Sequence, residues 1–191
     1  MVKIRQAKLL VLMISLIILS GCAASEKLGD RYDAWREVFL SEPNQEITAD
    51  VSFSGVDRVS DYSLIYTRSE DSETIEVIEP ELISRVTAQI VGEKAELLFD
   101  SAVLETGHGI TDGLSPMTSL PVFMDFIGEG YIESIGRETD AGGVKLIVSE
   151  LELPDGSRMK LWQSEQSMEP VAAAIRSSDK IEARIKITKI N

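Results

Sequence analysis

The feature of this sequence that most constrains its fold is an alternation of apolar and polar residues that recurs in many short segments. Residues 45–54 show it first, and residues 181–188 show it most clearly, with Ile181, Ala183 and Ile185 separated by charged residues. A period of two places every second side chain on one face of a β-strand, so each segment predicts a half-buried strand. Breaks at spacings of about eight to twelve residues predict an antiparallel meander.

Turn-forming residues separate these segments. The clearest turn is Pro154-Asp155-Gly156, because these residue types favour the backbone angles of tight turns. No internal repeat or change of composition divides residues 28–191, so we expect a single domain. The predicted strands cover residues 47–53, 62–68, 74–78, 86–91, 94–106, 131–137, 143–153, 157–165, 170–175 and 181–188, with further turns at 55–60 and 177–180.

Two stretches depart from the period of two. Residues 28–41 place apolar side chains near a period of 3.6, which predicts an amphipathic helix that ends at Pro43. The second stretch begins with Ser115-Pro116, a typical N-cap followed by Pro at the first helical position, and runs to Gly128 and Gly130. Pro121 lies inside it, so we expect this helix to be split or kinked.

The second helical stretch is the most apolar part of the chain outside the N-terminus, and two interpretations of it stay open. It forms a core helix that plugs the sheet, or it forms a lid that moves over an apolar cavity. Flexible methionine side chains suit such an adaptable surface. The candidate residues for this cavity and lid come from both helical stretches: Trp35, Val38, Phe39, Met117, Leu120, Phe123, Met124, Phe126 and Ile127.

The N-terminus is typical of a secretory signal. Residues 1–21 combine three basic residues with an apolar run at 9–19, which has the length of a signal-peptide core and is too short to cross a bilayer. Leu19-Ser20-Gly21-Cys22 looks like a bacterial lipobox, and Cys22 is the only cysteine. We therefore predict that residues 1–21 are removed, that Cys22 carries diacylglycerol, and that residues 22–27 are a short linker. Ordinary cleavage that leaves a free thiol is the alternative.

The charge of the chain excludes some partners. The sequence has 19 Lys and Arg against 32 Asp and Glu. Lys3, Arg5 and Lys8 belong to the signal, so the remaining body has 16 against 32, a net charge of −16. Nucleic acid is excluded as a partner, because binding phosphate requires clustered cations. The same net charge predicts repulsion from an anionic membrane surface and steering towards a basic protein partner.

The search for catalytic chemistry gives few candidates. His108 is the only histidine and reads as a surface loop residue, so neither a His-based catalytic site nor a zinc site is expected. Glu150 and Glu152 could form a carboxylate pair, although exposed strand acids explain them more simply. We predict no catalytic residue, no metal ligand and no cofactor beyond the diacylglycerol on Cys22. The loop acids Asp57, Asp61, Asp71 and Asp112 do not fit a calcium-loop motif.

The order of elements, together with the stretches Tyr62–Thr67, Ile75–Pro80 and Leu114–Pro121, resembles the LolA/LolB lipoprotein-carrier superfamily. The resemblance implies an α+β fold, in which a strongly curved antiparallel sheet, an unclosed β-barrel, has helices covering its concave face. Within the superfamily the sequence is most similar to the germination lipoproteins of spore-forming clostridia, which act as partners of a cortex-cleaving amidase.

These observations predict a lipid-anchored protein on the extracytoplasmic face of the cell membrane, or on the outer membrane where the host has one. Two functions stay open. The first is a non-catalytic adaptor for an envelope protein, and the resemblance implies a cell-wall amidase as that partner. The second is a carrier or acceptor that binds acyl chains or a lipoprotein in an apolar cavity.

Overall fold

The computed structural model of the protein describes residues 27–54, 59–91, 94–99, 102–107, 114–177 and 182–191. Several predictions concern residues outside these ranges. They are the signal at 1–21, the lipidation of Cys22, the linker at 22–27 except for its last residue, the loop positions of Asp57, His108 and Asp112, and parts of the turns at 55–60 and 177–180.

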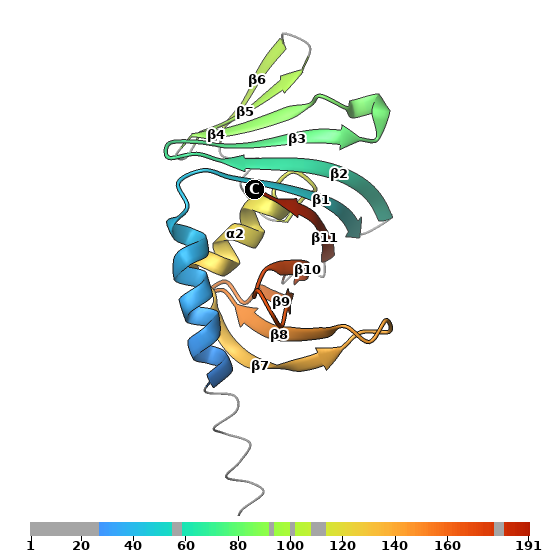
Figure 1. Cartoon of the computed structure of the whole chain (residues 1–191). Coiled ribbons are helices and arrows are strands. Elements are labelled where there is room, and N and C mark those ends of the chain that lie inside the picture. Colours follow the sequence, from blue (N-terminus) through green and yellow to red (C-terminus); the bar gives the residue numbers. More distant parts are fainter. Residues whose placement is uncertain (1–26, 55–58, 92–93, 100–101, 108–113, 178–181) are drawn as a thin grey trace, which may run out of the picture.

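The described strands form one antiparallel sheet in the order β6-β5-β4-β3-β2-β1-β11-β10-β9-β8-β7. Two meanders, β1 to β6 and β7 to β11, are joined where β1 pairs with β11. The sheet curves around the second helix, and β6 and β7 remain as its two edges (Figure 1). The expected α+β fold with an unclosed, curved antiparallel sheet is therefore confirmed.

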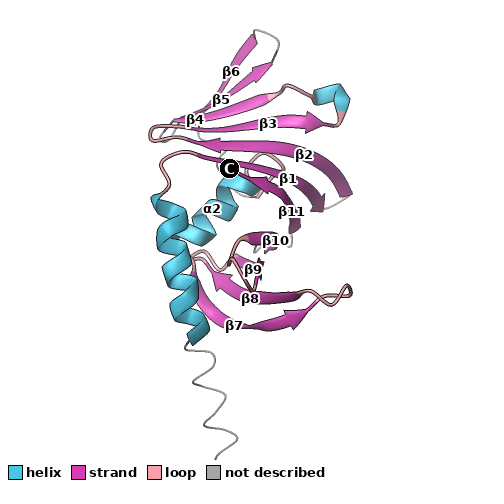
Figure 2. Cartoon of the chain, in the orientation of Figure 1, coloured by secondary structure: helices cyan, strands magenta, loops and turns pink. Residues whose placement is uncertain are grey.

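The elements follow the predicted alternation closely (Figure 2). An N-terminal helix covers residues 27–41 of the described chain. The other elements are β1 (Gln45–Ser54), β2 (Val59–Arg68), β3 (Glu73–Glu79), η1 (Glu81–Ile83), β4 (Thr87–Val91), β5 (Lys94–Phe99), β6 (Ala102–Gly107), α2 (Ser119–Glu129), β7 (Tyr131–Thr139), β8 (Lys145–Glu152), β9 (Arg158–Ser164), β10 (Pro170–Arg176) and β11 (Glu182–Ile190).

Three predictions about these elements are wrong, and the third concerns Pro121. Residues 94–106 do not form one strand, because β5 and β6 pair with each other in an antiparallel hairpin. The turn-forming types Asp100 and Ser101 stand between them in the sequence and were overlooked. In addition, α2 begins at Ser119 rather than at Pro116.

Pro121 does not split α2. It lies in the first turn of the helix, where a backbone N–H has no acceptor within the helix, so the missing donor costs nothing. Residues 116–118 form a turn before the helix. Ser115 and Thr118 brace that turn, since the Ser115 N–H donates to Thr118 Oγ1 at 2.7 Å and the Thr118 N–H donates to Ser115 Oγ at 3.1 Å.

The hydrophobic core lies between the helices and the face of the sheet that curves around them. Alternate residues of the strands are fully buried there, for example Ile47, Ala49 and Val51 on β1. The α2 helix contributes its apolar residues to the same core. It ends at Glu129. At the next residue, Gly130, a Cβ would lie 2.5 Å from the Phe126 carbonyl oxygen, so a larger residue would require the backbone to shift.

Arginine side chains connect the N-terminal helix to the rest of the fold. Arg36 donates hydrogen bonds to the carbonyl oxygens of Gly128 and Gly130 at the end of α2. Arg68 of β2 donates to the carbonyl oxygen of Leu40 at 3.2 Å, at the end of the N-terminal helix. Because the last carbonyls of a helix have no partner within it, these guanidinium groups stabilise both helix ends.

Candidate functional site

The structure places the predicted cavity and lid residues in the packed core, with one exception. Val38 is 63% exposed on the outer side of the N-terminal helix and does not join the others. Trp35 and Met117 are half-buried against the core, and the Trp35 ring lies 4.9 Å from the Phe39 ring. The remaining residues are buried: Phe39, Leu120, Phe123, Met124, Phe126 and Ile127.

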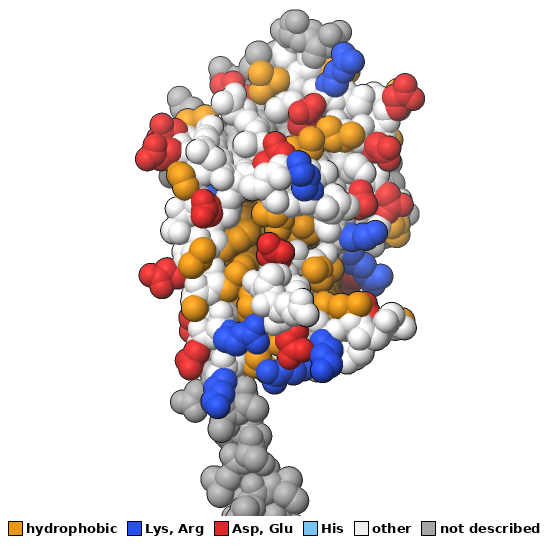
Figure 3. Space-filling view, in the orientation of Figure 1, with side chains coloured by type: hydrophobic (Ala, Val, Ile, Leu, Met, Phe, Trp, Pro, Cys, Tyr) orange, Lys and Arg blue, Asp and Glu red, His pale blue; other side chains and the backbone are white. Residues whose placement is uncertain are grey.

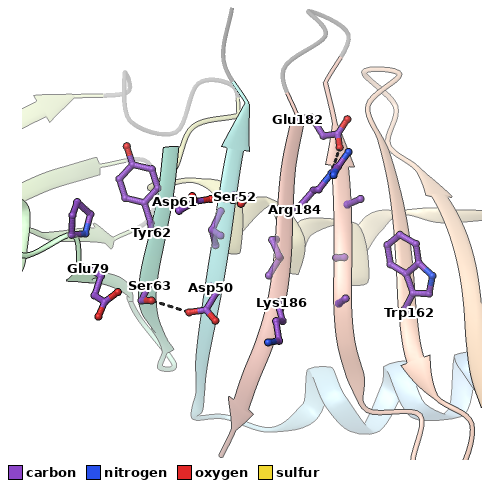
Figure 4. A pocket seen from close by; sticks show the side chains of 16 residues that line it. Asp50, Ser52, Asp61, Tyr62, Ser63, Glu79, Trp162, Glu182, Arg184 and Lys186 are labelled. Carbon is purple, nitrogen blue, oxygen red and sulfur yellow. Dashed lines mark hydrogen bonds and ion pairs between the residues drawn. The ribbon is translucent and has the colours of Figure 1, made fainter. Parts of the chain in front are cut away.

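A groove of about 870 Å³ lies on the other face of the sheet, away from the helices. Figure 4 looks onto this face, with the helices behind the strands. We call it the outer groove. It crosses β2, β1, β11, β10 and β9, and it is lined by Asp50, Val51, Ser52, Asp61, Tyr62, Ser63, Glu79, Pro80, Trp162, Ala172, Ala173, Ala174, Glu182, Arg184, Ile185 and Lys186.

Strand register builds the floor of this groove. Apart from Val51, Tyr62, Ala173 and Ile185, its lining residues belong to the half of each alternation that points away from the core. They form two rows of cross-strand neighbours, Trp162–Ala172–Lys186–Asp50–Ser63 and Lys160–Ala174–Arg184–Ser52–Asp61. Each row spans five strands, or about 19 Å at about 4.8 Å per strand.

The floor is lowest at β10, because Ala172 and Ala174 have the smallest side chains in the two rows. Trp162 does not cover them. Its indole N–H donates to the carboxylate of Glu138 on β7 at 3.2 Å, and the Lys160 ammonium bonds the same carboxylate at 2.8 Å. Lys160 also lies 5.0 Å from the centre of the Trp162 ring. These contacts hold the ring towards β7 and leave the alanines open.

Charge is divided across the outer groove. Asp50, Asp61 and Glu79 lie on the β1–β3 side, whereas Arg184 and Lys186 lie on β11 (Figure 4). Glu182 bonds Arg184 at 2.6 Å and Arg176 at 3.0 Å. Hydrogen bonds from these guanidinium groups lower the pKa of Glu182, so it stays ionised.

Lys186 is the cation of the groove that is available to a ligand. Asp50 is its register partner on β1, yet the Asp50 carboxylate accepts a hydrogen bond from the Ser63 hydroxyl at 2.8 Å. Within the described residues Lys186 forms no ion pair. Its exposed ammonium can therefore meet an anionic group without first breaking a contact.

A smaller pocket of about 290 Å³ continues the outer groove towards β7 and β8. It contains Glu150, whose carboxylate accepts from the Ser134 hydroxyl at 3.2 Å. Glu152 bonds Arg158 at 2.9 Å, and a hydrogen bond with Glu152 raises the pKa of Glu133. These acids are engaged in contacts along the sheet surface rather than arranged as an isolated carboxylate pair.

A third pocket, of about 440 Å³, lies beside the start of α2 and the turn between β2 and β3. Asp125 of α2 and Glu73 of β3 both line it. Burial, followed by the charges of Glu73 and Glu129, raises the pKa of Asp125 to about 6. Among the described residues no cluster of three or more His, Cys, Asp or Glu side chains could hold a metal ion.

Sequence reasoning missed the outer groove. The sequence contains one indication of the groove: Ala172 and Ala174 are two small residues on the solvent side of a predicted strand. Such residues indicate a hollow only when the strands on either side are known to carry larger side chains. A search of the described residues for membrane spans finds no helix with the length and apolar character needed to cross a bilayer.

Comparison with known proteins is informative at the level of the fold. No protein-family model matches the sequence, and no curated protein matches it. A DUF1329 family protein from Desulfovibrio piger is similar, with a TM-score of 0.52 and 12% identity over 86% of this chain and 92% of that chain. A putative outer membrane lipoprotein-sorting protein domain from Vibrio parahaemolyticus gives a TM-score of 0.50 and 9% identity over 88% and 92%.

The chain therefore shares the fold of these two structures, and its curved, unclosed antiparallel sheet is the fold that the sequence resemblance implied. A chain of the CwlD amidase–GerS lipoprotein complex from Clostridioides difficile also matches, with 17% identity over 80% of this chain and 87% of that chain. Its TM-score is 0.36, so this overlap does not relate the two chains beyond a general likeness.

Proposed function

We propose that this protein is a lipid-anchored, extracytoplasmic lipoprotein that acts as a non-catalytic binding module, with the outer groove as its docking site for a protein partner. The observation that carries the proposal is the open floor at Ala172 and Ala174 between larger side chains on β9 and β11. A row of about 19 Å matches about six residues of extended peptide at about 3.3 Å each. The divided charge would fix the direction of such a segment.

The groove supports binding rather than catalysis. Two serines, Ser52 and Ser63, lie on its floor, and they donate to the carboxylates of Asp61 and Asp50, respectively. A serine becomes a nucleophile when a base such as histidine or lysine accepts its proton. Here each hydroxyl bonds an aspartate rather than a histidine or lysine, so these pairs are better suited to ordering the floor of the groove than to activating a nucleophile.

The anchor rests on Cys22 and the lipobox before it. Two acyl chains on one residue hold a protein firmly, since each buried methylene contributes about 0.8 kcal/mol. Mass spectrometry of the mature N-terminus tests this part: a Cys22 residue that carries diacylglycerol supports it. A free Cys22 thiol in protein purified from cells would contradict it.

The partner is sought by in-cell cross-linking followed by purification of the anchored protein. Ala174→Trp fills the groove and should remove the partner, whereas Leu82→Trp adds the same ring at a site that is 90% exposed on η1. A partner captured by wild type and by Leu82→Trp, lost with Ala174→Trp and weakened by salt supports the proposal. Equal capture by all three proteins contradicts it. A purified cell-wall amidase is the first candidate for direct binding, because the sequence resemblance implies that class.

A carrier of acyl chains is the second candidate. The observation that favours it is the gathering of apolar side chains at the centre of the face that carries α2, between β1–β3 and β7–β8 (Figure 3). A ligand there would require α2 to move, because Phe123 and Phe126 are fully buried. Native mass spectrometry of protein purified from cells distinguishes the two functions: a bound lipid that delipidation removes supports the carrier, and an empty protein supports the adaptor.

A further inference from the structure

Cations gather at the end of the molecule where the described chain begins. Lys27 and Arg31 lie in the first turns of the N-terminal helix, and Arg137 and Lys145 lie on β7 and β8. We call these four residues the basic end. Figure 3 shows Lys and Arg side chains along this end of the molecule, next to the start of the helix.

One turn of the chain brings the basic end together. Glu165, which follows β9, bonds the Arg137 guanidinium at 2.6 Å. Its carbonyl oxygen accepts from Arg31 at 2.7 Å, and its N–H donates to the Lys145 carbonyl oxygen at 3.4 Å. The nearby cations lower the pKa of Glu165, first Arg137 through its hydrogen bond and then Lys145 and Arg31 through their charges. Arg31, Arg137 and Lys145 therefore outnumber the Glu165 carboxylate that they surround.

Two cations of the basic end, Lys27 and Lys145, remain available to an external anion. Lys27 and Lys145 are exposed, and within the described residues neither forms an ion pair. Glu165 is the carboxylate that bonds within this cluster, and it interacts with three cations, Arg31, Arg137 and Lys145. This local excess occurs in a domain whose net charge is strongly negative.

The basic end lies close to the proposed lipid anchor at Cys22. Five residue steps separate Cys22 from Lys27, and a fully extended chain covers at most about 3.6 Å per residue, or about 18 Å in all. The Debye length at physiological salt is about 8 Å. A domain held this close feels the charges that face the headgroups far more strongly than those on its distant side.

We propose that the basic end is a membrane-docking surface that binds anionic phospholipid headgroups and sets the orientation of the anchored domain. This inference rests on the proposed anchoring at Cys22. None of the residues that line the outer groove belongs to the basic end, so docking leaves the groove open to a partner. The net charge of the body predicted repulsion from such a surface, but screening makes the local charge decide.

Lysine footprinting on vesicles tests the proposal. The mature chain is coupled through the thiol of Cys22, its only cysteine, to a maleimide lipid in vesicles of phosphatidylcholine or of phosphatidylcholine with phosphatidylglycerol. Acetylation of each lysine is then followed by mass spectrometry. On anionic vesicles Lys27 and Lys145 should react at least about tenfold more slowly, and this protection should vanish near 1 M salt, where the Debye length is about 3 Å. Lys189, at the far end of β11, should react equally on both vesicles.

A matched pair of variants sharpens the test. Lys27→Gln should reduce the protection of Lys145 about fivefold, the change that about 1 kcal/mol per cation near the surface produces. Arg85→Gln removes one exposed charge beside η1 and should leave that protection unchanged. Equal reactivity on both vesicles, or equal protection of Lys189, would overturn the proposal. Because the tether is imposed chemically, this outcome is independent of whether cells lipidate Cys22.

Discussion

The two faces of the sheet are built from the same strands and differ in what fills the space above them. On β10, Ala173 points into the core and is 2% exposed, because α2 and the N-terminal helix cover that face. Its neighbours Ala172 and Ala174 point the other way, where no helix of the described residues covers them, and form the floor of the outer groove. One alanine thus makes room for a helix of the same chain, and the other two leave room for another molecule.

The comparison teaches that small residues have opposite effects on the two faces. Inside, an alanine is the side chain that lets the helices approach the sheet, so enlarging it costs stability. On the outer face, an alanine next to the larger side chains of Trp162 and Lys186 leaves a hollow that is open to solvent, so no empty cavity forms inside the protein. Stability should therefore depend on the inner face and binding on the outer face, and the following variants test that division.

The largest effect is expected from Phe123→Ala on α2. Phe123 is fully buried in the inner core, and truncation of a buried Phe costs about 3–5 kcal/mol through lost burial and the cavity left behind. Urea denaturation measures the change. Val38→Ala on the exposed side of the N-terminal helix is the control and should cost little. A loss below about 1 kcal/mol for Phe123→Ala would mean that α2 is not held in the core.

Arg36→Ala should produce the next largest loss. Its guanidinium bonds the carbonyl oxygens of Gly128 and Gly130, and hydrogen bonds to charged groups contribute about 1.5–3 kcal/mol. Thermal unfolding and hydrogen exchange at the end of α2 report the change. Arg85→Ala, at an exposed arginine, provides the comparison. Equal stability of the two variants would show that the N-terminal helix is not joined to α2 through Arg36.

The sharpest comparison uses neighbouring residues on one strand. Ala173→Phe should cost about 1–3 kcal/mol, because it overfills the inner core. Ala174→Phe, on the outer face, should change stability by less than about 0.5 kcal/mol and still abolish partner binding. Urea midpoints and a binding assay are measured on both proteins. If Ala174→Phe were the more destabilising of the two, the assignment of the faces would be wrong.

The smallest effect concerns pH. The pKa of Asp125 rises from its ordinary value near 4 to about 6 on folding, so the folded protein holds this proton more tightly. Its contribution to stability is present below about pH 4 and is lost as the pH rises towards 6. Because the carboxylate is partly exposed, screening limits the effect to about 1 kcal/mol at most.

Asp125→Asn removes this titration. It should be more stable than wild type at pH 7, and the difference should disappear near pH 4, as measured by urea midpoints across that range. Asp71→Asn, at an exposed acid of the same pocket, serves as the reference variant. A wild-type advantage at pH 7 would contradict the sign of the pKa change.

Much of the fold was predictable because it follows from local patterns. The alternation of Ala183 and Ile185 with charged residues predicted the inner face of β11, and both are buried. The period of 3.6 predicted that Leu28, Tyr32, Trp35, Val38 and Phe39 form the apolar stripe of the N-terminal helix. Leu28, Tyr32 and Phe39 are buried and Trp35 is half-buried, whereas Val38 is exposed. The division into β5 and β6 was not predicted, because the apolar pattern continues on both sides of residues 100–101. The start of α2 was predicted too early, because Ser115-Pro116 has the residue types of a helix start although the helix begins at Ser119.

Which residues of each segment share a face follows from the amino-acid sequence, since a period of two or 3.6 is a property of neighbouring residues. What those faces meet depends on how the whole chain packs. The outer groove requires β1 to pair with β11, so that Asp50 comes beside Lys186 from far along the chain. The basic end likewise requires Lys145 and Arg31 to converge on Glu165. Register and convergence are set by packing of the whole core, and no local pattern contains them.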